Sequence, residues 1–302
     1  MLRQSAFTGG KKMLKGGLHC HTTRSDGKCS PEETMQIHAD NGYDFLAITD
    51  HRQYNYKTYL PESGITIIPG MEIDATFYRD IGFRTYHTVC LGPDDETNGF
   101  AQDEEYCCKD VKTQEDFQKY LDDVHSKNNL TFYCHPEWSG TPVRYFEKLK
   151  GNFAMEIWNS GGADENFMDT NAAYWDDMLG LGHKIWGVAV DDGHQPHHHC
   201  KGWVMVNADN DVKSILAALA EGKFYSSCGP VIKDFYVEDG KVFIDTEGEC
   251  AKIWFCADAH PSKQFSDTDH AEADLRDSYD YVRAVVMDKE GRRAWTNPIF
   301  IK

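Results

Sequence analysis

This sequence contains few long apolar runs and no C-x-x-C cysteine pair. No uncharged apolar run approaches the roughly 20 residues that a membrane-spanning helix needs. The first 15 residues carry arginine and lysine without an apolar stretch after them, so they do not resemble a secretory signal. The ten cysteines form no C-x-x-C pair, which argues against a zinc ribbon or a thioredoxin-type site. We therefore expect a cytoplasmic protein with reduced thiols and no membrane partner.

Positive charge is also scarce. The 31 lysines and arginines face 49 acidic residues, which gives a net charge of −18. Long nucleic acids bind mainly through neutralisation of their phosphates, so this charge disfavours a long nucleic acid as a partner. A small anionic substrate held by bound metal is still compatible with it. Hydrophobic residues make up 40% of the chain and aromatic residues 13%, enough for a core, which excludes global disorder.

Seven short apolar or β-branched runs recur along the chain, and helical patterns separate several of them. The runs cover residues 17–22, 44–51, 65–73, 85–92, 130–135, 153–159 and 184–191. Capping residues and apolar stripes predict helices at 31–42, 113–128, 142–149 and 165–179. This alternation is typical of parallel strands with helical crossovers. It predicts an α/β fold, a barrel related to the eight-stranded one, with the active site at the carboxyl ends of the strands.

The pattern changes after Asp192. A short strand at 202–206 and a helix at 211–222 precede period-two runs at 242–244, 253–255, 281–287 and 294–301. We expect three parts. They are a flexible N-terminal tail at 1–15, the α/β barrel at 16–223 and a small β-rich C-terminal domain at 224–302. Two acidic stretches, 94–110 and 266–280, are expected to be loops.

Metal-capable side chains lie near the ends of six of the seven runs. The set is His19, His21, Asp26, His51, Glu72, His87, His135, Asp192 and His194. Strand alternation places His19 and His21 on one face, about 6–7 Å apart, and the strand ends of a barrel converge on one rim. Nine ligands exceed what a dimetal site uses, so three ions that share a carboxylate fit the count. Imidazole and carboxylate ligands suit zinc, manganese or iron, and we expect two to three such ions.

These residues, in this order, resemble the PHP domain, the polymerase and histidinol phosphatase family. The matching motifs are His19-x-His21-Thr22, Ser25-Asp26-Gly27, Thr49-Asp50-His51, Glu72, His87, His135-Pro136 and Asp192-x-His194. The resemblance covers about residues 16–223 and implies a distorted seven-stranded (β/α) barrel with a trinuclear centre. Residues 224–230 and 295–300 are similar to stand-alone members of the phosphoesterase type with an appended C-terminal β domain.

The resemblance also implies a division of the ligands among three ions. The first ion would take His19, His21, Glu72 and Asp192. The second would take Glu72, His87 and His135, with Glu72 as the bridge. The third would take Asp26, His51 and His194. Some relatives carry histidine where Asp26 stands, and aspartate there is a known variant.

A centre of this kind supports hydrolysis. Two metal ions about 3.5–4 Å apart acidify a shared water, and a third supplies charge for a phosphoryl oxygen. The nucleophile would be the metal-bridging water held by Glu72 and Asp192, because the sequence shows no G-x-S-x-G elbow and no P-loop. We predict a metal-dependent phosphoesterase that hydrolyses a small phosphorylated metabolite or short nucleotide. Two alternatives stay open: a hydrolase of a carbamate, amide or carboxylic ester, and a non-catalytic metal-stabilised module. The sequence leaves the oligomeric state open.

Four residues are candidates for substrate contacts. Arg24 lies in the turn between His21 and Asp26, and Arg52 directly follows His51, so each could reach a phosphate. Asn159 ends the one strand without a ligand, where it could touch substrate or orient a ligand, as could Glu156. His197 belongs to a loop of three histidines that could line the substrate mouth.

Overall fold

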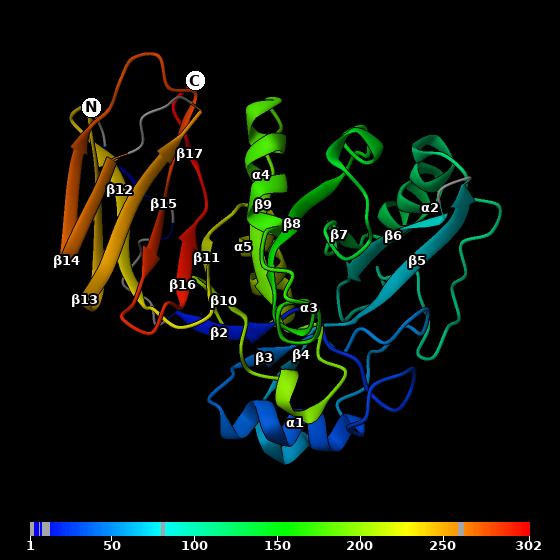
Figure 1. Ribbon diagram of the computed structural model, residues 1–302. Helices are drawn as coiled ribbons and strands as arrows, with labels where there is room; N and C mark the ends of the chain where they lie inside the picture. Colours follow the sequence, from blue (N-terminus) through cyan, green and yellow to red (C-terminus); the bar gives the residue numbers. More distant parts are fainter. Residues whose placement is uncertain (1–2, 6, 8–12, 80–81, 259–262) are drawn as a thin grey trace.

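The computed structural model describes residues 3–5, 7, 13–79, 82–258 and 263–302, and it shows a mixed α/β fold (Figure 1). The α-helices are α1 Pro31–Asp40, α2 Gln114–Ser126, α3 Ser160–Asn166, α4 Asn171–Gly180 and α5 Val212–Ala220. Short 3₁₀ helices are η1 Pro61–Ser63, η2 Val143–Tyr145 and η3 Pro196–His198. The described residues contain no helix with the length and apolar character of a membrane span.

One sheet has the strand order β5-β6-β7-β8-β9. Its strands are β5 Gly70–Arg79, β6 Gly82–Leu91, β7 Leu130–Tyr133, β8 Asn152–Asn159 and β9 Trp186–Val190. The pairs β7–β8 and β8–β9 are parallel, as expected. The pairs β5–β6 and β6–β7 are antiparallel, so the prediction of parallel strands is wrong for β6. Two residues separate β5 from β6, far fewer than a parallel crossover needs, so β6 returns as a hairpin.

A second sheet has the order β1-β12-β13-β15-β16-β11-β10-β2-β3-β4, with β14 on β13 and β17 on β15. Its first members are β1 Gln4–Ser5, β2 Leu14–Gly17, β3 Phe45–Leu46, β4 Thr66–Ile67, β10 Trp203–Val206 and β11 Phe224–Ser227. The later members are β12 Ile232–Glu238, β13 Lys241–Ala257, β14 Lys263–Asp274, β15 Tyr281–Met287, β16 Arg293–Thr296 and β17 Ile299–Phe300. Within this sheet β2, β3 and β4 pair in parallel.

Backbone hydrogen bonds link the two sheets at one rim. The Asp192 amide donates to the His19 carbonyl at 3.0 Å, which joins the end of β9 to the chain after β2. The Arg52 amide donates to the Glu72 carbonyl at 2.7 Å, which joins the chain after β3 to β5. The ends of strands from both sheets therefore meet around one centre.

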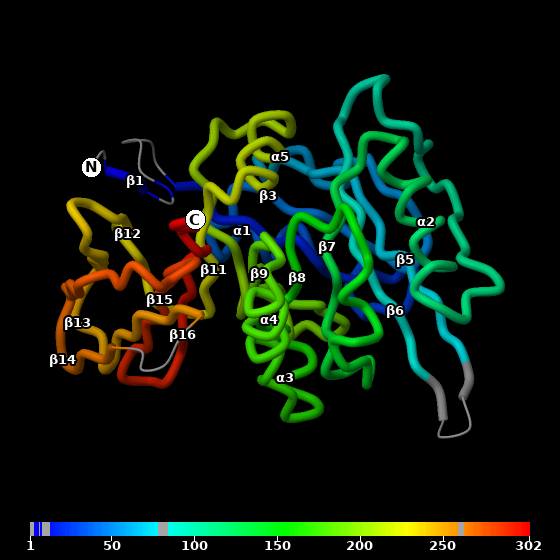
Figure 2. The backbone as a smooth tube through the Cα atoms, turned by 90° about the horizontal axis from the view of Figure 1, so that it is seen from above, coloured from blue at the N-terminus to red at the C-terminus, as the bar shows by residue number. Residues whose placement is uncertain are grey.

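The C-terminal strands lie to one side of the α/β part (Figure 2). Their own core contains Phe235, Ile244, Ile253 and Val286, all fully buried. The expected loop at 266–280 is wrong up to Asp274, because β14 pairs along β13. This strand is exposed and largely acidic or polar, with two buried alanines near its end, so it lacks the apolar alternation that marks a strand.

The structure differs in part from two further expectations, the flexible N-terminal tail and the helix at 142–149. Gln4 and Ser5, within the segment expected as a flexible tail, pair with β12, and Phe7 is 4% exposed in the C-terminal core. Residues 1–2, 6 and 8–12 of that segment lie outside the described residues. The helix expected at 142–149 is only the 3₁₀ turn η2, whereas the capping box at Ser30 starts α1 as expected.

Candidate metal centre

All nine metal-capable residues named from the sequence gather at the rim that joins the two sheets. The side chains of Glu72 on β5 and His87 on β6 meet diagonally, because the residue directly opposite His87 is Asp74. The others come from the chain that follows β2, β3, β7 and β9. His87 lies within β6 rather than at its end, because β5 and β6 stay paired beyond it as far as Arg79 and Gly82.

Four of these residues bring ligand atoms to one point. His19 Nε2 lies 3.1 Å from His21 Nε2 and 3.4 Å from both Glu72 Oε2 and Asp192 Oδ1. His21 Nε2 lies 3.2 Å from the same Glu72 oxygen and 3.1 Å from the same Asp192 oxygen. In a tetrahedral site with bonds of about 2.0–2.1 Å, ligand atoms lie about 3.3–3.4 Å apart. The spacing therefore fits a cation at the centre of the four.

The Glu72 carboxylate also meets three further imidazoles. Oε1 lies 2.8 Å from His87 Nδ1 and 3.4 Å from His135 Nε2, and Oε2 lies 3.0 Å from His51 Nδ1. The side chain of Glu72 is fully buried. One carboxylate thus contacts five imidazoles with its two oxygens, which is the position that a ligand shared between ions requires.

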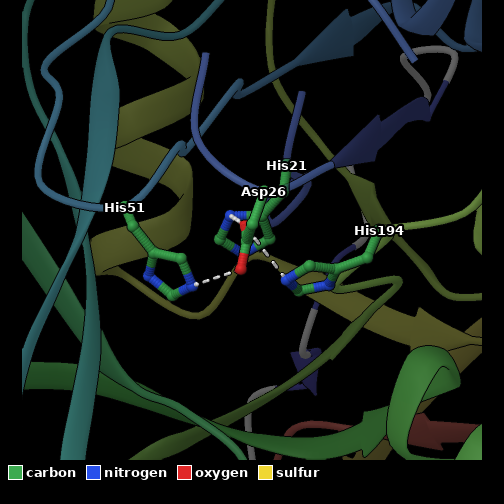
Figure 3. A group of neighbouring side chains, drawn as sticks. All are labelled: His21, Asp26, His51 and His194. Atoms are coloured by element: carbon green, nitrogen blue, oxygen red, sulfur yellow. Dashed lines mark ion pairs between the residues drawn. The ribbon is translucent and has the colours of Figure 1, made fainter. Parts of the chain in front are cut away.

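A third group surrounds Asp26, whose carboxylate points between three imidazoles (Figure 3). Asp26 Oδ1 lies 3.4 Å from His194 Nε2 and 3.7 Å from His21 Nδ1, and Oδ2 lies 3.6 Å from His51 Nε2. His51 therefore stands between Glu72 and Asp26, with one ring nitrogen toward each. Asp26 is the most exposed member of this group, with 55% of its side chain accessible.

Two buried atoms show that this rim fits metal ions. Glu72 Oε2 and His51 Nδ1 have no hydrogen-bond partner among the described residues, although they lie 3.0 Å apart. Leaving buried polar atoms unpaired costs free energy, and a cation between them would satisfy both. The donor set of imidazoles and carboxylates suits zinc, manganese or iron.

Glu156 orients two of the ligand residues, His19 and His135, through hydrogen bonds. Its Oε1 accepts a hydrogen bond from His19 Nδ1 at 2.7 Å, and its Oε2 accepts one from the His135 amide at 2.9 Å. Because Glu156 holds a proton on His19 Nδ1, Nε2 is the nitrogen available to a metal ion, and it faces Glu72 and Asp192. The structure thus gives Glu156 a role in orienting a ligand.

Backbone strain marks two ligand positions. Asp192 has φ of 48° and His135 has φ of 22°, in a region that residues with a side chain rarely adopt. Such strain persists where the surrounding structure enforces it, and it is concentrated at functional sites. Here the bond from the Asp192 amide to the His19 carbonyl holds one of the two.

Contacts between the carboxylates and the imidazoles of the rim shift the pKa values of both kinds of group. Burial would raise the pKa of the Glu72 carboxyl, but the nearby imidazoles, His19 first, hold this pKa well below its usual value. Burial would lower the pKa of His51, but Glu72 raises it to about 9. Burial would also lower the pKa of His194, but its hydrogen bond to Asp26 raises it to about 9. His51 and His194 therefore keep their protons beside ionised carboxylates, and a metal cation would replace these protons.

A cavity of about 310 Å³ opens onto the rim. Besides ligands, its lining includes Lys28, Trp138, Asn159, His198 and the acidic Glu165. Trp138 is 46% exposed and packs edge-on against the rings of His87 and His135. Lys28 is not among the candidates predicted from the sequence. The only sequence feature that points to Lys28 is its position directly after Asp26-Gly27. In the structure the Lys28 amide donates a hydrogen bond to the His194 carbonyl at 2.9 Å.

The two arginine candidates flank a neighbouring hollow of about 350 Å³, which Asp26 and His51 also line. The guanidinium of Arg24 pairs with Asp103 and lies 3.6 Å from Asp50 Oδ2. Arg52 is 46% exposed, and its Nε lies 3.3 Å from Asp74 Oδ1. Both guanidinium groups are thus held by carboxylates at the edge of the third ligand group.

The other two candidates for substrate contacts are Asn159 and His197, which do not line the hollow beside the arginines. Asn159 Nδ2 donates to Asp192 Oδ2 and to Glu156 Oε2, both at 3.0 Å, and its Oδ1 caps α3 through the Gly162 amide. It therefore orients a ligand while also lining the cavity. Of the three-histidine loop, it is His198 rather than His197 that lines the cavity.

Comparison with known proteins gives a family match and several more distant likenesses. The model of the PHP domain family matches residues 17–225. The DNA polymerase/3'-5' exonuclease PolX of Bacillus subtilis is 49% identical over 41 residues, which are 14% of this chain and 7% of that relative. The match thus spans a small fraction of the curated relative's length.

Two solved structures share low sequence identity with this chain. One is a two-domain protein of Bacteroides vulgatus that contains a predicted PHP-like metal-dependent phosphoesterase. It is 13% identical, with 97% of this chain and 96% of that chain covered and a TM-score of 0.48. The other is an amidohydrolase of Chromobacterium violaceum, 15% identical, with 60% of this chain and 88% of that chain covered and a TM-score of 0.42.

Proposed function

Because this chain belongs to the PHP domain family, we propose that it is a metal-dependent phosphoesterase that hydrolyses a small phosphorylated metabolite or a short nucleotide. The observation that carries this proposal is the buried Glu72 carboxylate, whose two oxygens contact five imidazoles. Charged groups of opposite sign gathered in this way, and facing a cavity, are typical of a catalytic site rather than of a stabilising core.

The proposal includes three metal positions that share ligands. His19, His21, Glu72 and Asp192 would hold one ion, and Glu72 with His87 and His135 a second. Asp26, His51 and His194 would hold the third. Bound there, the ions would supply an acidified water and positive charge against an anionic transition state. The protein's own part is to orient these ligands through Glu156 and Asn159 and to expose them in one cavity.

The size and charge of the site favour a small phosphate ester. The cavity of about 310 Å³ is at the lower end of the range for ligand pockets, and Lys28 and the two arginines lie at its margins or in the neighbouring hollow. The net charge of −18 disfavours a long polyanion. We further propose that the rim strands form the family's distorted seven-stranded barrel and that residues 224–302 are an appended β-rich domain. Bonds at the rim and the separate C-terminal core support this division.

A substrate screen tests the proposal. Metal-loaded protein is assayed for phosphate release on a panel of phosphate monoesters and short nucleotides, and in parallel for hydrolysis of neutral carboxylic esters and carbamates. We expect turnover of at least one phosphate ester, and none of it in Glu72→Gln. Turnover confined to the carboxylic esters or carbamates would replace the phosphoesterase with an acyl hydrolase. Fully metal-loaded protein with no activity on either panel would favour a metal-stabilised module.

A further inference from the structure

A second buried cluster lies beside the rim and includes none of the nine residues described above. It consists of His38 on α1, Asp191 directly after β9, and His199 directly after η3. Their exposed fractions are 0%, 2% and 6%. One ligand-capable atom from each lies within 4.8 Å of the others. The cluster therefore joins three segments that are distant along the chain.

His38 has an unpaired nitrogen that faces a carboxylate. Its Nδ1 lies 2.8 Å from the Thr34 carbonyl, which can only accept, so Nδ1 carries the proton. In the neutral ring, Nε2 then presents a lone pair. It lies 3.6 Å from Asp191 Oδ2 and has no hydrogen-bond partner among the described residues. A lone pair facing a carboxylate oxygen is repulsive unless a positive charge lies between them.

His199 has no hydrogen-bond partner for either ring nitrogen within the described chain, although it is 94% buried. The ring is seated against Gly193, where an added Cβ would come within 2.4 Å of His199 Nδ1. A glycine is thus needed for this imidazole to occupy its place. A protonated His38 would explain the contact with Asp191, but it would leave both nitrogens of His199 unsatisfied, at a cost in free energy.

Asp191 is held in a fixed orientation. Its Oδ1 accepts from the Lys201 and Gly202 amides, both at 2.8 Å, and from Ser160 Oγ at 2.9 Å. Its Oδ2 accepts from the Cys200 amide at 2.6 Å and faces His38. Backbone donors of this kind favour the ionised carboxylate, and they leave a lone pair of Oδ2 available to a further cation.

We propose that His38 Nε2, Asp191 Oδ2 and a ring nitrogen of His199 bind a divalent metal ion of the zinc class. Two imidazoles and one carboxylate are a common zinc donor set, and the bond from His38 Nδ1 to a backbone carbonyl is the usual orientation of a metal-binding histidine. Ligand atoms of a filled tetrahedral site lie roughly 3.3 Å apart, so the side chains close in on the ion by a small rotation.

We assign this site a structural role, because none of its three ligands lines the cavity at the rim, and a water molecule would take the fourth position on the ion. The site ties α1 to the end of β9, so it holds the peptide that leads into Asp192, whose φ of 48° is strained. The site thereby stiffens the segment that carries Asp192 and His194 to the rim. It does not depend on the rim's chemistry, because none of its three ligands belongs to the rim set.

The number of bound ions tests the proposal. The full chain is loaded with zinc, desalted and analysed for metal content alongside His199→Gln and the matched control His125→Gln. His125 is partly buried and bonded to Thr131 Oγ1 at 2.8 Å, away from both clusters. We expect His199→Gln to hold one ion fewer than the wild type and the control. The double variant His38→Gln/His199→Gln should lose the same single ion. Equal metal content in His199→Gln and the wild type would overturn the proposal.

A measurement on the unaltered chain covers the case in which these variants do not fold. Anomalous diffraction from zinc-soaked crystals should show a peak between His38 Nε2 and Asp191 Oδ2, separate from any peaks at the rim. Occupied rim positions with no peak at this cluster would overturn the proposal and leave the proposed function intact. A peak here with an empty rim would support this site and count against the phosphoesterase.

Discussion

Exchange of Glu156 for glutamine tests how this protein orients its metal ligands. The variant keeps the size of a fully buried side chain but replaces one carboxylate oxygen by an NH₂ group. In the native chain Oε1 accepts from His19 Nδ1, and Oε2 accepts from the His135 amide and from Asn159 Nδ2. Glutamine has one oxygen, so it can serve only one of these two sides.

Both orientations of the glutamine are unfavourable. If its oxygen faces His19, its NH₂ group meets the two donors of His135 and Asn159, which lose their acceptor. If the NH₂ group faces His19, Nδ1 must accept, and the proton moves to Nε2, the atom that would bind metal. Loss of such an orienting partner typically costs 10–100-fold in metal affinity, or about 1.4–2.7 kcal/mol.

Metal titration measures the effect. Metal-free Glu156→Gln, wild type and the exposed control Glu115→Gln are titrated with zinc against a competing chelator, and circular dichroism confirms that each is folded. We expect the affinity of at least one ion to fall 10–100-fold in Glu156→Gln only. Higher metal concentration should restore part of the activity. A folded Glu156→Gln that binds every ion as tightly as the wild type would refute the reasoning.

Further predictions concern the ligands and the cavity. Glu72→Gln should lower turnover at least about a thousandfold, and more than about a tenth of native activity would refute the bridging role. Arg24→Ala should lower phosphoester turnover roughly tenfold to a thousandfold but spare a neutral ester; equal losses would mark it as support for the metal site. Lys28→Ala should raise KM for a phosphate ester about tenfold, and an unchanged KM would remove it from the substrate contacts.

The pKa values of two rim histidines predict how zinc affinity depends on pH. His51 and His194, each with a pKa of about 9, must lose a proton to bind metal, so zinc affinity should rise with pH until about 9 and level off above it. Without metal their contribution to stability should be complete below pH about 6.5 and lost as pH rises through about 9. Calorimetry in buffers of different ionisation enthalpy measures the protons released, and zinc binding without proton release at neutral pH would contradict this prediction.

The sequence predicts β6, β7, β8 and β9 closely, because each combines an apolar run with a polar residue near one end. The run at 17–22 overlaps β2 only at Gly17, and the run at 65–73 covers β4 and the start of β5. The sequence does not predict strand direction at β6, because direction depends on the two-residue connection after β5 rather than on the composition of either strand. It does not predict β14, because an exposed edge strand needs few apolar residues and its charged side chains resemble a loop.

In the candidate site too, the sequence shows local patterns but does not show contacts that depend on tertiary packing. Histidines and acids at strand ends are visible as a pattern, so the residues that meet at the rim could be named in advance. The sequence places Glu156 near the end of the strand without a ligand, where it could orient one, but only the structure shows that it contacts His19 and the His135 amide. The cluster of His38, Asp191 and His199 joins segments whose contact depends on tertiary packing, so spacing along the chain gives no sign of it.

The most direct test of the central claim is a metal titration of metal-free protein, followed by phosphate release from the best ester of the screen. The account predicts no release without metal. Release should rise as zinc, manganese or iron fills the rim, reach a plateau near three rim ions per chain, and be absent in Glu72→Gln at every metal concentration. Phosphate release that is independent of added metal, or equal in Glu72→Gln and the wild type, would contradict it.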